Sequence, residues 1–396
     1  MPVIAPPAAH RRTTTALGAC LVSFVAFWIA QRAAHVSMID LKVYRAEAAT
    51  VRAGGDLYAL RTTAARLPTT YPPFAALLFT PLTLLDTGLL RTLARAGNLA
   101  LLVVFARLSL RLVGHAREEA AWWIAAVAVW CEPVWTTMRY GQINLLIAVL
   151  VLWDLSRRPG GRWAGAGVGL AAAVKLTPAL FAVFLLATGA VARFRGDGAG
   201  PWLRHARGAA VAFAGATLLA AALLPGDSWR FWTGMVFRTS RVGRAEETAN
   251  QALRGVLARL LHTPDPGAVW AATAALVALL GLAVAVAAEL RGERAWAVVG
   301  CAVTALLVSP VSWSHHWVWC VPLVLLLWTR GHRAGAVGTA LVFGSYALWW
   351  VPHGPGRPEL HQGLAQFALS ALYGGAGLLF LVLAGHRCRG PAGIRP

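Results

Sequence analysis

The chain has 396 residues, of which 58% are hydrophobic and only 13% are charged, and its formal net charge is +20. A soluble domain would carry about 25% charged residues, so the composition excludes an ordinary soluble enzyme. Apolar runs of about 15–22 residues recur along the whole chain, near the length that a membrane-spanning helix needs. Much of the arginine lies in short loops between these runs, which favours anchoring to membrane lipids over binding of nucleic acid. The sequence therefore predicts an all-α polytopic membrane protein.

The first apolar run lacks a clear small-residue cleavage site, so we interpret it as a retained signal-anchor helix. Arg11 and Arg12 precede it and predict that the N-terminus lies inside. About twelve transmembrane spans are expected along the chain. They lie near residues 16–37, 92–112, 120–137, 142–156, 163–175, 178–191, 207–224, 268–289, 295–310, 316–329, 334–351 and 364–385.

The segment 74–85 is apolar but short, and two prolines precede it. Counting it as a span would move every later arginine cluster to the outside, against the bias of short loops toward positive charge inside. We therefore interpret it as a helix on or dipping into the outer face; an ordinary short span is the alternative.

This topology predicts cytoplasmic tails at residues 1–15 and 386–396 and a single transmembrane domain at 16–385. The outer loops 38–91 and 225–266 are expected to form an active-site face, because nearly all polar residues suited to chemistry lie on that side. A transporter, the rival class, would place such residues near the middle of the bilayer. The sequence therefore favours an enzyme of the cell membrane with its active site on the outer face.

Asp40 lies at the outer end of the first long apolar run. A carboxylate is ionised at neutral pH and only accepts hydrogen bonds, which suits a general base that takes a proton from a hydroxyl group. The alternative is a carboxylate that marks the water boundary or pairs with Lys42 or Arg45. Position alone does not separate the two interpretations.

Lys175 lies deep in an apolar context, directly before Leu-Thr-Pro. An ionisable residue in such a place indicates a functional site, and a lysine at a helix break suits a phosphate group as a point charge. A snorkelling lysine at the outer head groups is the alternative.

His315 and His316 stand between Trp313 and Trp317, where they suit hydrogen bonding to a phosphate or a sugar. Adjacent residues of a helix point in different directions, so at most one histidine is expected to face a given ligand. An interfacial aromatic belt with two incidental histidines is the alternative.

Further candidates for substrate binding come from the outer loops. Neutral amides both donate and accept hydrogen bonds, which suits sugar hydroxyls, and arginine suits an anionic head group. Solvated loop residues are the alternative for each of them. The candidates are Tyr71, Gln142, Asn144, Asn250, Gln251, Arg254 and Trp313.

The five cysteines have no CxxC spacing, and most of them lie inside apolar runs, where they act as small hydrophobic residues. The two neighbouring histidines have no further ligands at a spacing suited to zinc. The sequence therefore predicts neither a disulfide framework nor a metal site.

Taken together, an ordered set of short motifs resembles glycosyltransferase family 87, the polyprenol-phosphate-mannose-dependent α-(1→2)-mannosyltransferases of the GT-C membrane fold. Each motif is weak alone, but the ordered set is fairly specific and runs over most of the chain. The family pattern often begins with aspartate–phenylalanine, whereas Leu41 follows Asp40 here. The motifs are Asp40–Tyr44, Gly55–Tyr58, Tyr71–Phe74, Gly141–Asn144, Lys175–Pro178, Asn250–Gly255 and Ser309–His316.

The resemblance implies an inverting enzyme that transfers mannose from polyprenyl-phosphate mannose to a glycolipid or glycan acceptor, without a nucleotide or an evident metal. It implies that Asp40 deprotonates the acceptor hydroxyl. Lys175 and one of His315 or His316 would stabilise the departing phosphate by preorganised electrostatics. Arabinose instead of mannose, the identity of the acceptor and the oligomeric state stay open.

Overall fold

The computed structural model describes residues 7–115, 117–157 and 161–389. Within these ranges the regular structure is helical, apart from one antiparallel hairpin of two short strands, β1 (Arg61–Thr62) and β2 (Leu67–Pro68). The prediction of an all-α fold is thereby confirmed. Residues 1–6 and 390–396 of the two expected cytoplasmic tails lie outside the described residues.

Helices occupy the rest of the ordered chain. The α-helices are α1 (Pro7–Ala33), α2 (Ile39–Arg52), α3 (Pro73–Leu78), α4 (Thr87–Leu112), α5 (Glu118–Ala128), α6 (Glu132–Tyr140), α7 (Asn144–Leu155), α8 (Ala166–Val174), α9 (Ala179–Phe194), α10 (Gly200–Leu223), α11 (Pro225–Thr233), α12 (Leu253–Leu260), α13 (Gly267–Leu290), α14 (Arg294–Val308), α15 (Cys320–Thr329), α16 (Arg333–Gly344), α17 (Leu364–Ser370) and α18 (Leu372–Arg389). Short 3₁₀ helices are η1 (Thr80–Leu84), η2 (Met235–Phe237), η3 (Thr239–Val242), η4 (Ser314–Trp319), η5 (Ala347–Trp350) and η6 (Pro358–His361).

Four of the described helices, in α1, α4, α10 and α13, are long and apolar enough to cross a membrane. Two pairs bent by 119° and 71°, α6–α7 and α17–α18, raise the number to six if each pair is one span. Other expected spans coincide with shorter apolar helices such as α9 and α14. The structure supports a polytopic membrane protein, and the number of twelve spans stays a prediction.

The ambiguous segment 74–85 forms two short helices rather than one long one. α3 has 6 residues and η1 has 5, and they meet at Phe79. Pro72 is the N-cap of α3, and a second proline lies in the first turn of η1. Because proline has no backbone N–H to donate, neither helix continues toward its N-terminus. A helix rises only about 1.5 Å per residue, so neither piece reaches across a bilayer core of about 30 Å. This geometry argues against an ordinary span, and the placement at the outer face stays a prediction.

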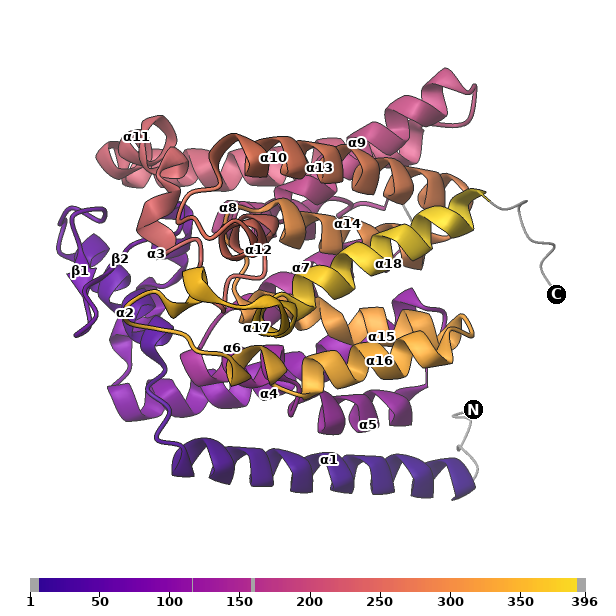
Figure 1. Ribbon diagram of the computed structural model, residues 1–396, viewed down its shortest axis with the longest axis horizontal. Coiled ribbons are helices and arrows are strands. Elements are labelled where there is room, and N and C mark those ends of the chain that lie inside the picture. The colour runs from indigo at the N-terminus through magenta and orange to yellow at the C-terminus, as the bar shows by residue number, and fades with distance from the viewer. Residues whose placement is uncertain (1–6, 116, 158–160, 390–396) are drawn as a thin grey trace.

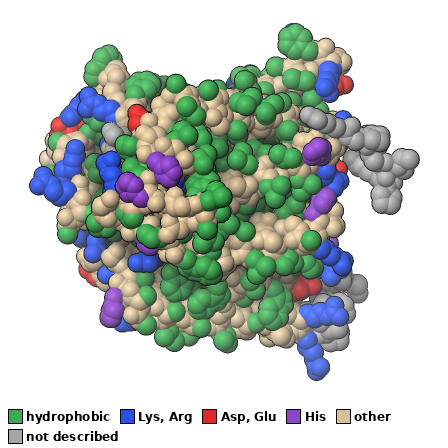
Figure 2. Space-filling view, viewed as in Figure 1, with side chains coloured by type: hydrophobic (Ala, Val, Ile, Leu, Met, Phe, Trp, Pro, Cys, Tyr) green, Lys and Arg blue, Asp and Glu red, His purple; other side chains and the backbone are tan. Residues whose placement is uncertain are grey.

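The long helices run side by side (Figure 1). α2, the β1–β2 hairpin, α3 and α11 lie together at the left of the view, whereas α1 begins and α18 ends at the right. Hydrophobic side chains cover much of the middle of this face, and Lys and Arg gather toward its two ends (Figure 2). The end that carries the hairpin is the one where the candidate site is found.

Helices α8 and α10 touch through their backbones. A Cβ atom placed on Gly169 would lie 2.3 Å from the carbonyl oxygen of Ala209, and one on Gly208 would lie 1.9 Å from that of Ala164. Small residues allow this approach, a common device where membrane helices pack. The contact fixes α8, whose C-terminal end delivers Lys175 to the candidate site.

We expect Gly169→Ala to destabilise the folded chain by about 1–3 kcal/mol, because the new methyl group has no space between the two backbones. Gly215→Ala, on α10, is the matched control: no atom lies within 4 Å of its added Cβ, and alanine favours the helix. Thermal unfolding in detergent compares the two variants. Equal melting temperatures would contradict the packing described for α8 and α10.

Candidate active site

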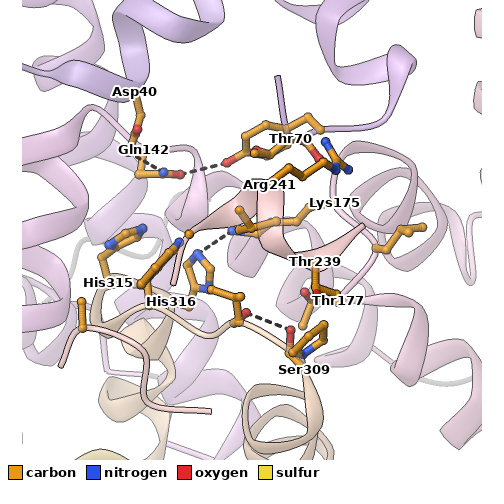
Figure 3. A pocket seen from close by; sticks show the side chains of 18 of the residues that line it. Asp40, Thr70, Gln142, Lys175, Thr177, Thr239, Arg241, Ser309, His315 and His316 are labelled. Carbon is orange, nitrogen blue, oxygen red and sulfur yellow. Dashed lines mark hydrogen bonds between the residues drawn. The ribbon is translucent and has the colours of Figure 1, made fainter. Parts of the chain in front are cut away.

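A cavity of about 940 Å³ lies between α2, the hairpin, the end of α8 and the start of η4 (Figure 3). Its volume is in the range of small-molecule binding sites. The cavity collects most of the residues that the sequence singled out. Those that line it are Asp40, Tyr71, Gln142, Lys175, Trp313, His315 and His316.

A tight turn between α6 and α7 places Asp40 against Gln142. Gly141 adopts a left-handed φ of 70° and ends α6, and a Cβ there would lie 2.8 Å from the Cβ of Leu41. Helix α2 therefore packs directly on this turn, which glycine alone accommodates readily. The amide Nε2 of Gln142 donates to Oδ2 of Asp40 at 2.6 Å.

A tyrosine pair holds Gln142 in turn. The hydroxyl groups of Tyr44 and Tyr71 donate to Oε1 of Gln142 at 2.7 Å and 3.1 Å, and they lie 2.9 Å from each other. With its oxygen occupied by hydroxyl donors, the Gln142 amide is oriented with its nitrogen toward Asp40. Asp40 makes no ion pair with Lys42 or Arg45 within the described residues. The alternative of a paired helix-end carboxylate is therefore not what the structure shows.

Burial raises the pKa of Asp40 to about 6, while the hydrogen bond from Gln142 and the charge of Lys175 oppose this rise. The raised pKa places Asp40 nearer to neutrality than an ordinary carboxyl group, which suits a general base. At neutral pH most of the group is still ionised and able to accept a proton.

The pKa of Asp40 predicts how transfer activity depends on pH. Activity should fall as pH decreases through about 6, because protonated Asp40 cannot accept a proton. Gln142→Leu removes a hydrogen bond that lowers this pKa, so the acid limb should move to higher pH. Profiles of kcat/KM against pH for wild type and variant test this. An acid limb at the same pH in Gln142→Leu would remove Gln142 from the description of the base.

Lys175 stands on another wall of the cavity. Helix α8 ends at Val174, and Lys175 has extended backbone angles before the Leu-Thr-Pro segment starts α9. Its Nζ donates to Oδ1 of Asn144 at 3.2 Å and lies 2.8 Å from Nε2 of His316. A charged Lys175 donates to His316 only if the ring is neutral with its proton on Nδ1.

His315 and His316 both line the cavity, and the expectation that at most one of them faces a given ligand stays a prediction. They lie at the start of η4, which forms part of the cavity wall, and their ring centroids are 4.8 Å apart. Asn144 and Thr137 both donate to the backbone oxygen of His315, at 2.9 Å each, and fix this turn. Within the described structure, the buried Nε2 of His315 has no hydrogen-bond partner.

Four predicted binding residues do not line the cavity: Asn144, Asn250, Gln251 and Arg254. Asn144 lies behind the wall, where it bonds Lys175 and the backbone oxygen of His315. Asn250 and Gln251 are fully buried; Asn250 Oδ1 accepts from the amide of Ser312, and Gln251 Nε2 donates to the backbone oxygen of Ser370 at 2.6 Å. Arg254 donates to Thr239 and stacks on Trp270. Asn250 and Gln251 both bond the backbone of Ser312 and so support the loop that carries Trp313 and η4.

The sequence interpretation missed polar residues buried behind the wall. Glu132 accepts hydrogen bonds from Ser314, Trp349, Tyr373 and Thr136 and thereby fixes the serine beside the two histidines. Its place within an apolar run was a signal, because a buried carboxylate needs several donors.

Arg241 also lines the cavity, and its guanidinium donates to the backbone oxygens of Thr69, Thr70 and Met235. Glu47 follows Asp40 by two helical turns and is buried, which raises its pKa to about 8. The i, i+7 spacing on α2 was a signal for Glu47, whereas the sequence held none for the partners of Arg241.

The described residues contain no group of three or more His, Cys, Asp or Glu side chains arranged to hold a metal ion. The cavity instead presents a carboxylate on one wall and a lysine–histidine pair on another. A base that accepts a proton and an ammonium that stabilises a leaving anion are the groups that a group-transfer reaction needs.

Comparison with known proteins identifies the kind of transfer. The model of glycosyltransferase family 87 matches residues 70–310. The polyprenol-phosphate-mannose-dependent α-(1-2)-phosphatidylinositol pentamannoside mannosyltransferase of Mycobacterium tuberculosis (strain CDC 1551 / Oshkosh) is 35% identical, over 82% of this chain and 74% of its own. The chain belongs to glycosyltransferase family 87 and is a membrane glycosyltransferase, which decides against the rival class of transporters.

Two further relatives have the same kind of name. The polyprenol-phosphate-mannose-dependent α-(1-2)-phosphatidylinositol mannoside mannosyltransferase of M. tuberculosis (strain ATCC 25618 / H37Rv) is 36% identical, over 72% of this chain and 68% of its own. A pentamannoside mannosyltransferase of Mycolicibacterium smegmatis is 35% identical, over 74% and 69%. No solved structure matches the chain significantly.

Proposed function

We propose that the chain transfers a mannosyl unit from polyprenyl-phosphate mannose to a hydroxyl group of a mannosylated glycolipid, with inversion and formation of an α-(1→2) linkage, at the outer face of the membrane. The observation that carries the proposal is the placement of Asp40 and the Lys175–His316 pair on one cavity of about 940 Å³. The names of the relatives support the donor, the linkage and an acceptor of the phosphatidylinositol mannoside type.

Asp40 acts as the general base. The acceptor hydroxyl gives its proton to Asp40 as its oxygen forms a bond to the anomeric carbon of the donor sugar. The bond from that carbon to the phosphate oxygen breaks, and its electron pair stays on the lipid phosphate. Gln142 holds the carboxylate in place through its hydrogen bond of 2.6 Å.

Lys175 and His315 hold the donor phosphate, and His316 helps to hold the Lys175 ammonium. The ammonium has one donor left besides its bonds to Asn144 and His316, and the unpartnered Nε2 of His315 offers another in the tautomer that carries its proton there. These groups stand in place before the reaction, so they stabilise the charge of the departing phosphate without reorganisation. The donor thus supplies its own leaving group, and the reaction needs no nucleotide.

The transfer assay tests the proposal. The purified full chain in nanodiscs receives polyprenyl-phosphate mannose labelled in the sugar, together with a phosphatidylinositol mannoside as acceptor. We expect label in the glycolipid, with an α-(1→2) linkage by NMR. Label that stays on the polyprenyl phosphate, or transfer only from the arabinose-bearing donor, would overturn the proposal.

A further inference from the structure

The β1–β2 hairpin forms one wall of the cavity mouth. Its residues Ala65, Arg66, Leu67 and Pro68 line the cavity, and the amide of Arg66 donates to the backbone oxygen of Thr63 at 3.0 Å to close the turn. Neither the base chemistry nor the donor site described above uses this wall. Its role is therefore open.

Arg66 differs from the two other Lys or Arg side chains that line the cavity. The Lys175 ammonium contacts Asn144 and His316, and the Arg241 guanidinium donates to three backbone oxygens. The exposed side chain of Arg66 has no hydrogen-bond or ion-pair partner among the described residues. A cation without a partner at the mouth of a binding cavity is available to an incoming anion.

The backbone of Arg66 is also unusual. Its φ is 51°, in the left-handed region that residues other than glycine, asparagine and aspartate seldom adopt. Such conformations are found where the surrounding structure or a function holds them. A glycine would fit this turn more easily, so the turn itself does not require arginine.

The root of the hairpin is tied down on the far side. Arg241 holds the backbone oxygens of Thr69 and Thr70, and the side chain of Asp227 accepts from the amide of Leu57. Arg66 is thus presented from an anchored loop, and its guanidinium can engage a ligand at the mouth while the donor phosphate occupies the Lys175 wall.

We propose that Arg66 binds the phosphodiester of an anionic glycolipid acceptor and thereby selects charged over neutral acceptors. This inference rests on the proposed function, in which the acceptor sugar reaches Asp40 from the cavity mouth. Guanidinium matches the planar oxygen pairs of a phosphate with two parallel hydrogen bonds, which lysine cannot reproduce. A neutral mannoside offers no such group.

Equilibrium binding to the purified full chain tests the inference without relying on turnover. The ligands are a phosphatidylinositol mannoside and a neutral alkyl mannoside, and the variants are Arg66→Gly and Arg66→Lys. Glycine suits the positive φ, so the first variant removes the guanidinium without straining the turn. The matched control is Arg61→Ala, on the opposite strand of the hairpin, where the arginine donates to the backbone oxygens of Tyr58 and Leu60.

We expect Arg66→Gly to weaken binding of the anionic acceptor about 3- to 10-fold, as for a solvent-accessible bidentate pair, and Arg66→Lys to weaken it less. Binding of the neutral mannoside and of the donor should not change, and Arg61→Ala should bind like wild type. Unchanged affinity for the anionic acceptor, or an equal loss for both acceptors, would overturn the inference. Absence of transfer by the wild type, with acceptor binding still sensitive to Arg66, would overturn the proposed function and leave the anion site standing.

Discussion

Asp40→Asn is expected to lower the rate of mannosyl transfer by about 10²–10⁴-fold, the usual contribution of a general base. Asparagine has nearly the same shape and still accepts the hydrogen bond from Gln142 through its oxygen, but it cannot take up a proton. The variant should therefore fold, insert and bind the donor. Initial rates with saturating donor and acceptor, together with thermal unfolding of the purified variant, measure both properties.

Asp265→Asn provides the control for this prediction. Asp265 lies in the expected outer loop 225–266, and its side chain is 71% exposed. Its only ion pair among the described residues is with Arg254, and neither residue lines the cavity. Its variant should transfer mannose at the wild-type rate. Near-normal turnover by Asp40→Asn would remove Asp40 from the mechanism.

Lys175→Ala is expected to weaken binding of polyprenyl-phosphate mannose by roughly 10- to 150-fold. A hydrogen bond between an ammonium and a phosphate in a partly desolvated site contributes about 1.5–3 kcal/mol, which corresponds to this loss. Lys175→Arg keeps the charge but replaces a point donor by a planar fork, so it should rescue only part of the affinity. The effect is measured as the KM for the donor at saturating acceptor.

The chain has one other lysine, and it serves as the control. Lys42 is exposed on α2, two residues after Asp40, and carries the same charge. Lys42→Ala should leave the KM for the donor unchanged. A wild-type KM in Lys175→Ala would indicate that Lys175 is a snorkelling residue and that His315, His316 or Arg241 holds the phosphate instead.

Much of the architecture follows from the pattern of the sequence. Apolar runs predicted helices because a bilayer requires every backbone group to be satisfied within a segment, and helices occur at each expected position. Their lengths were harder to predict: the expected spans 120–137 and 364–385 are each divided into two helices, at residues 129–131 and at Ala371. Such breaks depend on tertiary contacts, which the apolar pattern alone does not contain.

The candidate site was only partly predictable from residue types. Asp40 and Lys175 were identified because ionisable groups are costly in an apolar setting, and such groups usually serve a function. Asn250 and Gln251 carry amide side chains, as Gln142 does. Only the fold shows that the first two join loops and that Gln142 faces the cavity. The exposed loop arginines likewise differ only in their partners, which is why Arg66 did not stand out.

The central claim is that one cavity contains both a base for the acceptor and a cationic site for the donor phosphate. Equilibrium binding of polyprenyl-phosphate mannose to purified Asp40→Asn and Lys175→Ala, side by side with wild type, tests this claim most directly. We predict wild-type donor affinity in Asp40→Asn and donor affinity lowered roughly 10- to 150-fold in Lys175→Ala. Equal donor affinity in both variants, or a loss confined to Asp40→Asn, would contradict the claim.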